Sequence, residues 1–243
     1  MRMMTFARRN AREMVRDPLT MAFGLGFPLV LLLLLSAIQA NIPVALFEIQ
    51  HLTPGITIFG LSFMTLFSAT LISRDRNSSL LRRLYTTPLT PLDFILGYTL
   101  PMIPIAVGQC VICYGAALVL GLEVSAGMAF AMLLIIPAAA LNIALGLLFG
   151  SILNDKQVGG VCGALLTNLS AWLSGVWFDL DLVGGAFRRI AHMLPFVHAV
   201  EMERAALAGS LSGVFPHIWW VLGYAVAAAG AAVWLFLRQM KKE

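Results

Sequence analysis

The sequence predicts an all-α, polytopic membrane protein with six transmembrane helices. Hydrophobic residues make up 60% of its 243 residues, charged residues only 12%, and the mean hydropathy is +0.88. Soluble domains carry about twice that share of charge, so the chain has too little polar surface for a water-soluble globule. This composition excludes an ordinary soluble enzyme, a disordered protein and a free nucleic-acid-binding protein. The net charge of +4 on so apolar a chain indicates a membrane surface as partner.

Six windows free of charged residues predict the six spans. A helix needs about 20 apolar residues to cross a bilayer, and each window is long enough for one crossing. Pro101 and Pro104 interrupt the third window, but spanning helices tolerate proline where neighbours satisfy the freed carbonyls. The predicted spans are residues 19–38, 53–73, 94–119, 128–152, 158–178 and 216–237, and all lie within one transmembrane domain of residues 19–243.

The basic residues predict the orientation. Six spans place both termini on the same side of the membrane. If that side is the cytoplasm, thirteen of the sixteen Lys and Arg residues lie there, and only Arg188, Arg189 and Arg204 lie outside. This bias fits the positive-inside rule and predicts cytoplasmic termini.

Residues 1–18 precede the first span and predict an amphipathic helix. Met3, Phe6 and Met14 fit one face of it, and arginines occupy the rest, up to Asp17-Pro18. A basic helix with one apolar face is typical of the membrane interface, so we expect this helix to lie on the cytoplasmic surface.

Residues 179–215 predict a re-entrant or interfacial helical hairpin on the outer side. They are too many for an ordinary loop, and apolar residues recur at helical spacing before and after Pro195. Re-entrant backbone is tolerated only against protein or a wet cavity. Glu201 and Glu203 are expected to face water. The candidates for an outer gate are Phe178, Asp179 and Pro195.

A short helix is predicted in the loop between the second and third spans, over about residues 78–87. Asn77, Ser78 or Ser79 can cap its start, and Thr87-Pro88 ends it, because the residue before proline disfavours the helical conformation. Such a helix suits a groove of another protein or a lipid surface. Its apolar face and arginine flank consist of Leu80, Leu81, Arg82, Arg83, Leu84 and Tyr85.

The sequence lacks motifs for catalysis and for binding a nucleotide as an internal energy source. It has no phosphate-binding G-x-x-x-x-G-K-[ST] motif and no common hydrolase or metal motif. No charged residue lies in a predicted span, which argues against an ion-coupled carrier. A polytopic membrane enzyme remains an alternative, with candidates at Asp179, Asp181, His192 and His198. A non-catalytic scaffold or immunity protein is another.

Several motifs resemble those of type-2 ATP-binding-cassette (ABC) transporter permeases. The loop resembles the coupling-helix signature of that family, although Asn77 stands where glycine is usual. The similarity extends over nearly all of the chain. The matching motifs are Arg74-Asp75-Arg76, Arg83-Leu84, Thr87-Pro88-Leu89, Phe94-Ile95-Leu96-Gly97, Ser174-Gly175-Val176-Trp177-Phe178, and Pro195, Ala199, Glu203-Arg204 with Gly209.

The resemblance implies a permease subunit of an ATP-driven exporter in the bacterial inner (plasma) membrane. Such a subunit is not catalytic itself and binds no cofactor, because two separate ABC ATPase subunits bind ATP and Mg²⁺. The permease would pair with a second copy or with a related chain. The helix at residues 78–87 would be the coupling helix that docks on an ATPase. The permease would also contact membrane lipid, and no nucleic-acid partner is expected.

Polar residues within the spans predict a substrate path only weakly. Such side chains are costly to bury in lipid, so they face protein, where they bond neighbouring helices or line a path. An apolar path without fixed charge suits an amphiphilic or lipid-like substrate, such as a drug, lipid or glycoconjugate. Two G-x-x-x-G motifs, at Gly146/Gly150 and Gly159/Gly163, would allow close helix contact. The candidate path residues are Ser62, Thr65, Gln109, Asn142 and Asn168.

Overall fold

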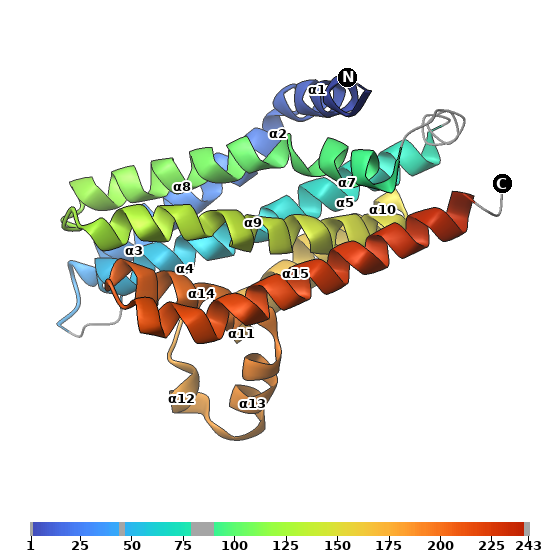
Figure 1. Cartoon of the computed structure of the whole chain (residues 1–243). Helices are drawn as coiled ribbons and strands as arrows, with labels where there is room; N and C mark the ends of the chain where they lie inside the picture. Colours follow the sequence, from blue (N-terminus) through green and yellow to red (C-terminus); the bar gives the residue numbers. More distant parts are fainter. Residues whose placement is uncertain (1, 44–46, 79–89, 241–243) are drawn as a thin grey trace.

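The computed structural model describes residues 2–43, 47–78 and 90–240 and shows a bundle of helices, with no strand in these ranges (Figure 1). The predicted all-α, polytopic fold class is confirmed. The elements are α1 (Arg2–Val15), α2 (Pro18–Met21), the π-helix η1 (Ala22–Gly26), α3 (Phe27–Gln39), α4 (Ile49–Gly60), α5 (Ser62–Asn77), α7 (Pro91–Thr99), α8 (Met102–Val119), α9 (Ala126–Ile152), α10 (Asp155–Val158), the π-helix η2 (Gly159–Leu166), α11 (Thr167–Leu173), α12 (Leu180–Val183), α13 (Gly185–Met193), α14 (Pro195–Leu207) and α15 (Leu211–Met240).

Five helical stretches in the described part are long and apolar enough to cross a membrane. The stretch formed by α4 and α5 is the most enclosed, with 89% of its apolar window buried, so it forms the centre of the bundle. These stretches match the first four and the last of the predicted spans. They are Ala22–Gln39, Ile49–Asn77, Leu92–Val119, Ala126–Ile152 and Leu211–Arg238.

The fifth predicted span, residues 158–178, differs from the others. The chain is helical from Asp155 to Leu173, through α10, η2 and α11, but this helix is not among the five long apolar ones. Asp155 and Lys156 lie in its first turn and Asn168 in its last third, which lowers its apolarity. Its crossing of the membrane stays a prediction.

Small residues bring α9 close to α5. A Cβ atom at Gly146 would lie 2.5 Å from the carbonyl oxygen of Thr65, and one at Gly150 would lie 2.7 Å from that of Ala69. No real side chain fits at such distances, so the expected close contact at this motif is confirmed. The second motif differs, because a Cβ at Gly159 would meet no atom within 4 Å.

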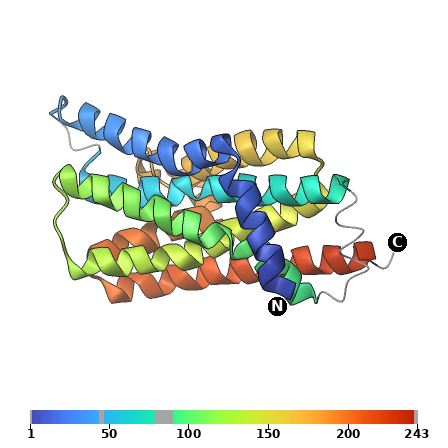
Figure 2. The same cartoon turned by 90° about the horizontal axis from the view of Figure 1, so that it is seen from above.

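α1 crosses the long helices instead of running along them, near the end of the bundle at which α15 finishes (Figure 2). Its buried face, with Phe6, Asn10 and Met14, packs on α7. The apolar face of α1 therefore packs on protein, and its position on the membrane surface stays a prediction.

The outer segment contains three short helices. α12 and α13 project from the side of the bundle (Figure 1). Their residues Leu180 and Ala191 form a small core with Leu173 of α11 and Val197 of α14. α14 instead packs between α15, α9 and α4. The expectation that Glu203 faces water is wrong, because this packing leaves its side chain 0% exposed.

Candidate functional site

The predicted coupling helix lies mostly outside the described residues, which resume at Thr90. The docking candidates Leu80, Leu81, Arg82, Arg83, Leu84 and Tyr85 all fall in this part. The structure does show how the chain enters and leaves it. α5 ends at Asn77, and α7 begins after a capping box in which Thr90 and Asp93 bond each other's backbone N–H groups.

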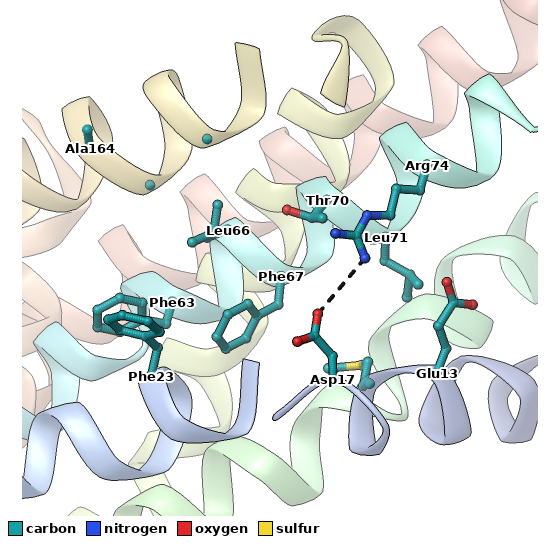
Figure 3. Close-up of a pocket in the computed structure, with 13 residues that line it drawn as sticks. Glu13, Asp17, Phe23, Phe63, Leu66, Phe67, Thr70, Leu71, Arg74 and Ala164 are labelled. Atoms are coloured by element: carbon teal, nitrogen blue, oxygen red, sulfur yellow. Dashed lines mark ion pairs between the residues drawn. The ribbon is translucent and has the colours of Figure 1, made fainter. Parts of the chain in front are cut away.

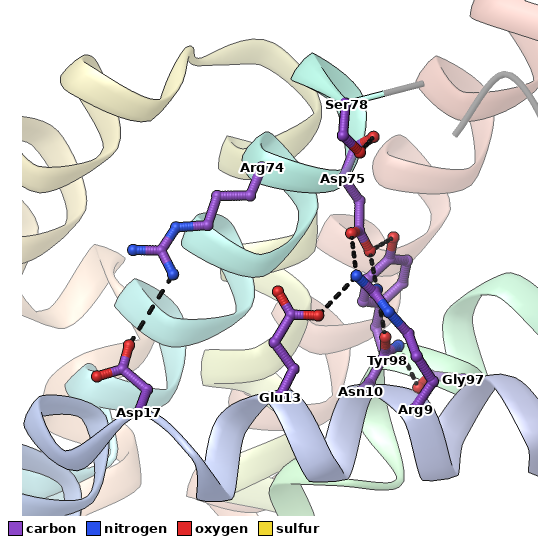
Figure 4. A network of polar contacts seen from close by, with 9 residues as sticks. All are labelled: Arg9, Asn10, Glu13, Asp17, Arg74, Asp75, Ser78, Gly97 and Tyr98. Atoms are coloured by element: carbon purple, nitrogen blue, oxygen red, sulfur yellow. Dashed lines mark hydrogen bonds and ion pairs between the residues drawn. The ribbon is translucent and has the colours of Figure 1, made fainter. Parts of the chain in front are cut away.

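Asp75, in the last turn of α5, is the centre of a buried polar network (Figure 4). The side chain is 2% exposed and accepts three hydrogen bonds. Two come from the guanidinium of Arg9 on α1, at 2.6 and 2.7 Å, and one comes from the Tyr98 hydroxyl on α7, at 2.8 Å. A bidentate arginine is the strongest partner that a buried carboxylate can have. Asp75 therefore joins three helices just before the predicted coupling helix.

The same network fastens α1 to α7. The Asn10 amide donates to the carbonyl of Gly97 at 3.0 Å, and the Phe6 ring packs edge-on against Tyr98 with centroids 4.9 Å apart. Burial by itself lowers the pKa of Arg9, but the hydrogen bond and charge of Asp75, together with Glu13, outweigh it and raise that pKa. Arg9 is therefore a permanent cation in this network.

A second group of contacts joins α5 to the ends of α9 and α10. The guanidinium of Arg76 donates to the carbonyls of Ser151 and Leu153, and the Ser73 hydroxyl donates to Asp155 at 2.8 Å. The Ser151 and Leu153 carbonyls lie at the C-terminal end of α9, where free carbonyls need partners, whereas Asp155 accepts with its carboxylate in the first turn of α10. The Arg74-Asp75-Arg76 motif was recognisable in the sequence, but the partners of Asp75 lie 66 residues away, at Arg9, and 23 residues away, at Tyr98, and Arg76 donates to backbone carbonyls.

An aromatic groove lies beside this network, between α5, η1 and η2 (Figure 3). It has a volume of about 500 Å³, within the usual range of ligand pockets. The rings of Phe23 and Phe63 lie 6.0 Å apart, and those of Phe63 and Phe67 lie 6.3 Å apart. At one end the groove reaches Glu13, Asp17 and Arg74; its opposite wall is made of the small residues Gly159, Gly163 and Ala164.

The structure gathers three of the five candidate path residues. The hydroxyl of Thr65 donates to Asn142 at 2.8 Å, and Ser62 and Asn142 line a small enclosed cavity. Gln109 lies elsewhere and donates to the Thr57 carbonyl at 2.9 Å, while Asn168 is exposed and donates to a carbonyl of its own helix. None of the five lines the aromatic groove. Interhelix hydrogen bonds account for Thr65, Asn142 and Gln109, whereas the Ser62 hydroxyl is buried without a partner among the described residues. A role in the path stays a prediction.

The outer gate candidates have structural partners. Phe178 packs between Trp172 and Phe187, and Pro195 is buried in the first turn of α14. Asp179 caps α12 by accepting from the backbone N–H of Asp181 at 2.9 Å. Their gating role stays a prediction.

The enzyme candidates on this outer side form two pairs: the rings of His192 and His198 lie 6.0 Å apart, and Asp179 accepts from the backbone N–H of Asp181. The Asp181 side chain pairs with Arg188 at 2.6 Å. No group of three or more metal-ligating side chains occurs in the described residues.

Glu203 is a site residue that sequence reasoning missed. It accepts a hydrogen bond from the Tyr114 hydroxyl at 2.8 Å, and its second oxygen has no partner among the described residues. Burial raises the pKa of Glu203 well above its usual range, and the bond from Tyr114 only partly opposes this. Burial therefore favours the protonated form of this side chain between α14 and α8. No local signal marks it, because its partner lies 89 residues away.

Comparison with protein families matches residues 1–208 to the model described as "ABC-2 type transporter". The match begins at α1 and ends just after α14, so it includes the Asp75 network, the aromatic groove and the outer segment. A search of curated proteins found no match.

Proposed function

The chain belongs to the ABC-2 type transporter family and is thus a membrane permease subunit, and we propose that it serves an ATP-driven exporter of an amphiphilic or lipid-like substrate. Separate ATPase subunits, two per complex, would bind ATP and Mg²⁺. The permease would pair with a second copy or a related chain in a bacterial inner membrane, with both termini in the cytoplasm.

The observation that carries this proposal is the attachment of the coupling segment. Residues 79–89 connect α5, anchored through Asp75 and Arg76, to α7, anchored through Tyr98 and Gly97. A force applied to this segment by a docked ATPase would reach α1, α5, α7 and α9 together. Packed elements joined in this way move as a unit, which is what a coupling device requires.

The aromatic groove supports the substrate class. Its walls are apolar over most of their length, and it lies next to the helices that the coupling segment would move. An apolar or amphiphilic cargo fits such walls better than a charged polymer does, because burying unpaired charge there is costly.

The docking role is tested with Leu84→Asp, which places a charge on the predicted docking face. Purified complexes are assayed for the bound ATPase subunit and for ATP-driven substrate release from vesicles. We expect loss of both, with normal membrane insertion. The matched control is Leu182→Asp on α12, where the side chain is 82% exposed and lies far from this loop in sequence. Full export by the Leu84→Asp variant would show that this face does not dock the ATPase.

A further inference from the structure

The aromatic groove continues into a polar vestibule. The vestibule has a volume of about 590 Å³ and lies between α1, the start of α2 and the last turn of α5. Glu13, Asp17 and Arg74 line both spaces. One molecule can therefore lie in the two spaces at once, with one part among the aromatic rings and the other among charged groups.

The vestibule has a surplus of positive charge. Four arginines and two acids line it. Arg9 is committed to Asp75 and Glu13, and Arg74 lies 3.9 Å from Asp17. Arg12 and Arg16 are exposed and make no ion pair with any residue in the described ranges. Two guanidinium groups are thus available to an anion from outside the chain.

We propose that groove and vestibule together form a binding site for an anionic amphiphile, with its tail against Phe23, Phe63 and Phe67 and its acidic headgroup at Arg12 and Arg16. This inference rests on the proposed function, because it names the chemical class of the cargo. Arginine suits the role, since its planar fork binds phosphate or carboxylate oxygens in pairs and stays charged at every physiological pH.

The arginines could instead meet the headgroups of the surrounding membrane, as basic amphipathic helices often do. Two features favour an occupied site. The apolar groove begins where the basic surface ends, and its far wall is built from glycine and alanine, which leave room for a tail. A resident anionic lipid and an anionic cargo share this chemistry, so the experiment has to separate them.

The test is photolabelling of the purified permease in phosphatidylcholine discs. The probes are a dodecyl phosphate and a dodecyltrimethylammonium that carry the same diazirine near the end of the tail, and the labelled peptides are identified by mass spectrometry. We expect the phosphate probe to label residues 63–71 and 159–164 at least about tenfold more than the ammonium probe does. Equal labelling by both probes would overturn the inference.

Two pairs of variants sharpen the result. Arg12→Gln with Arg16→Gln should reduce phosphate labelling by about tenfold or more, whereas Arg8→Gln, an exposed arginine of the same helix outside the vestibule, should not. Gly159→Leu should block the groove, whereas Gly160→Leu, next to it but outside the groove lining, should not. A Cβ at either glycine meets no atom within 4 Å, so both variants can fold. If both variants of either pair give the same labelling, the proposed location of the binding site is contradicted.

Cargo and resident lipid are separated by adding the ATPase partner and ATP to the labelled system before illumination. If the probe is cargo, it leaves the groove when ATP is hydrolysed, so labelling falls in the discs. In a parallel assay with the same permease in vesicles, the probe then appears on the far side of the membrane. Charge-selective labelling that ATP does not change supports the binding site and identifies its occupant as a resident lipid. This result contradicts the assignment of the anionic amphiphile as the exported cargo. Docking of the ATPase is read separately, from the Leu84→Asp variant.

Discussion

At Asp75, one carboxylate connects helices that are distant in sequence. Its three donors neutralise it in a site that is almost closed to water. A buried charge of this kind stabilises only while all its partners are in place, and the loss of one partner leaves the others unpaired. The residue scale therefore gives the most direct tests of the network.

Asp75→Asn keeps the shape of the side chain but removes its charge. We expect a loss of about 1.5–3 kcal/mol in the free energy of unfolding, because Arg9 loses its charged acceptor. Asp17→Asn is the control, since Arg74 lies 3.9 Å away and both side chains are partly exposed. It should cost less than about 1 kcal/mol. Chemical unfolding in detergent measures both, and equal losses would contradict the role of Asp75.

Glu203 offers a test of a buried neutral acid. Because burial raises its pKa well above the usual range, the folded state favours the protonated acid, whereas the unfolded chain releases this proton above about pH 4.3. The stability that the neutral acid contributes is therefore complete below that pH and is lost as the pH rises through the raised pKa. Glu203→Gln, which is neutral at every pH, should not lower the free energy of unfolding by more than about 1 kcal/mol. Glu203→Ala leaves the Tyr114 hydroxyl without an acceptor and opens a cavity, so we expect a loss of about 2–4 kcal/mol. Thermal unfolding compares the two, and a large loss in Glu203→Gln would show that the residue is ionised.

At the scale of elements, the stability of the bundle depends on how closely its helices approach. α9 meets α5 through glycines and packs against α15 along much of its length. α14 is too short to cross a bilayer. It is held by packing against its neighbouring helices and by a contact between two histidines, one on α14 and one on α15. These two contacts differ in what disturbs them, so each has its own test.

Gly150→Leu should separate α9 from α5. The new side chain would begin 2.7 Å from the Ala69 carbonyl, and backbone cannot yield as a flexible side chain can. We expect a loss of about 3 kcal/mol or more in the free energy of unfolding. Gly160→Leu, with open space around its Cβ, should cost less than about 1 kcal/mol. Melting temperatures of the purified variants decide, and similar values would contradict this packing.

The attachment of α14 to α15 should weaken in acid. His198 Nδ1 lies 2.9 Å from His217 Nδ1, and its Nε2 lies 3.0 Å from the His192 carbonyl. Burial lowers the pKa of His198, helped by the two neighbouring histidines and opposed by the His192 carbonyl and Glu201. The folded state thus binds the proton less readily than the unfolded chain. The stability that the neutral ring contributes is present above about pH 6.5 and is lost as the pH falls through the folded pKa.

Hydrogen exchange of residues 195–207, corrected for its intrinsic pH dependence, measures this effect. We expect faster exchange at about pH 5.5 than at about pH 7.5. The pH dependence should disappear in His198→Gln and persist in His51→Gln, because His51 is exposed and lies on another helix. Equal pH dependence in both variants would rule out the His198 contact as its source.

At the scale of the whole molecule, charge placement made the membrane architecture predictable. Windows without charge located the five long helices, because length and apolarity alone decide which helices can cross a bilayer. The position of Glu203 was not predictable in this way. Its helix, α14, carries several charged or titratable residues that suggest an aqueous face, but it packs against α4, α9 and α15.

The candidate site, too, was predictable only in part from the sequence. Arg74-Asp75-Arg76 could be recognised as a motif, but not its partner Arg9, which no local pattern distinguishes from Arg8 or Arg12. The aromatic groove was missed altogether, because its walls come from three separate spans. Polar side chains within the spans drew attention to Gln109 and Asn142, whereas the groove consists of phenylalanines that read as ordinary apolar residues.

Two walls of the groove, η1 and η2, are π-helical. A π-helical turn holds more residues than an α-helical one, and its hydrogen bonds span five residues instead of four. When such a turn changes to α-helical bonding, the side chains on one side of it rotate by about 100°, the angle of one residue. Such a change at η1 or η2 would turn Phe23 or Ala164 into or out of the wall while the helix stays continuous. The shift of helical register would change the width of the groove, so the proposed site would accept tails of different thickness without parting its helices.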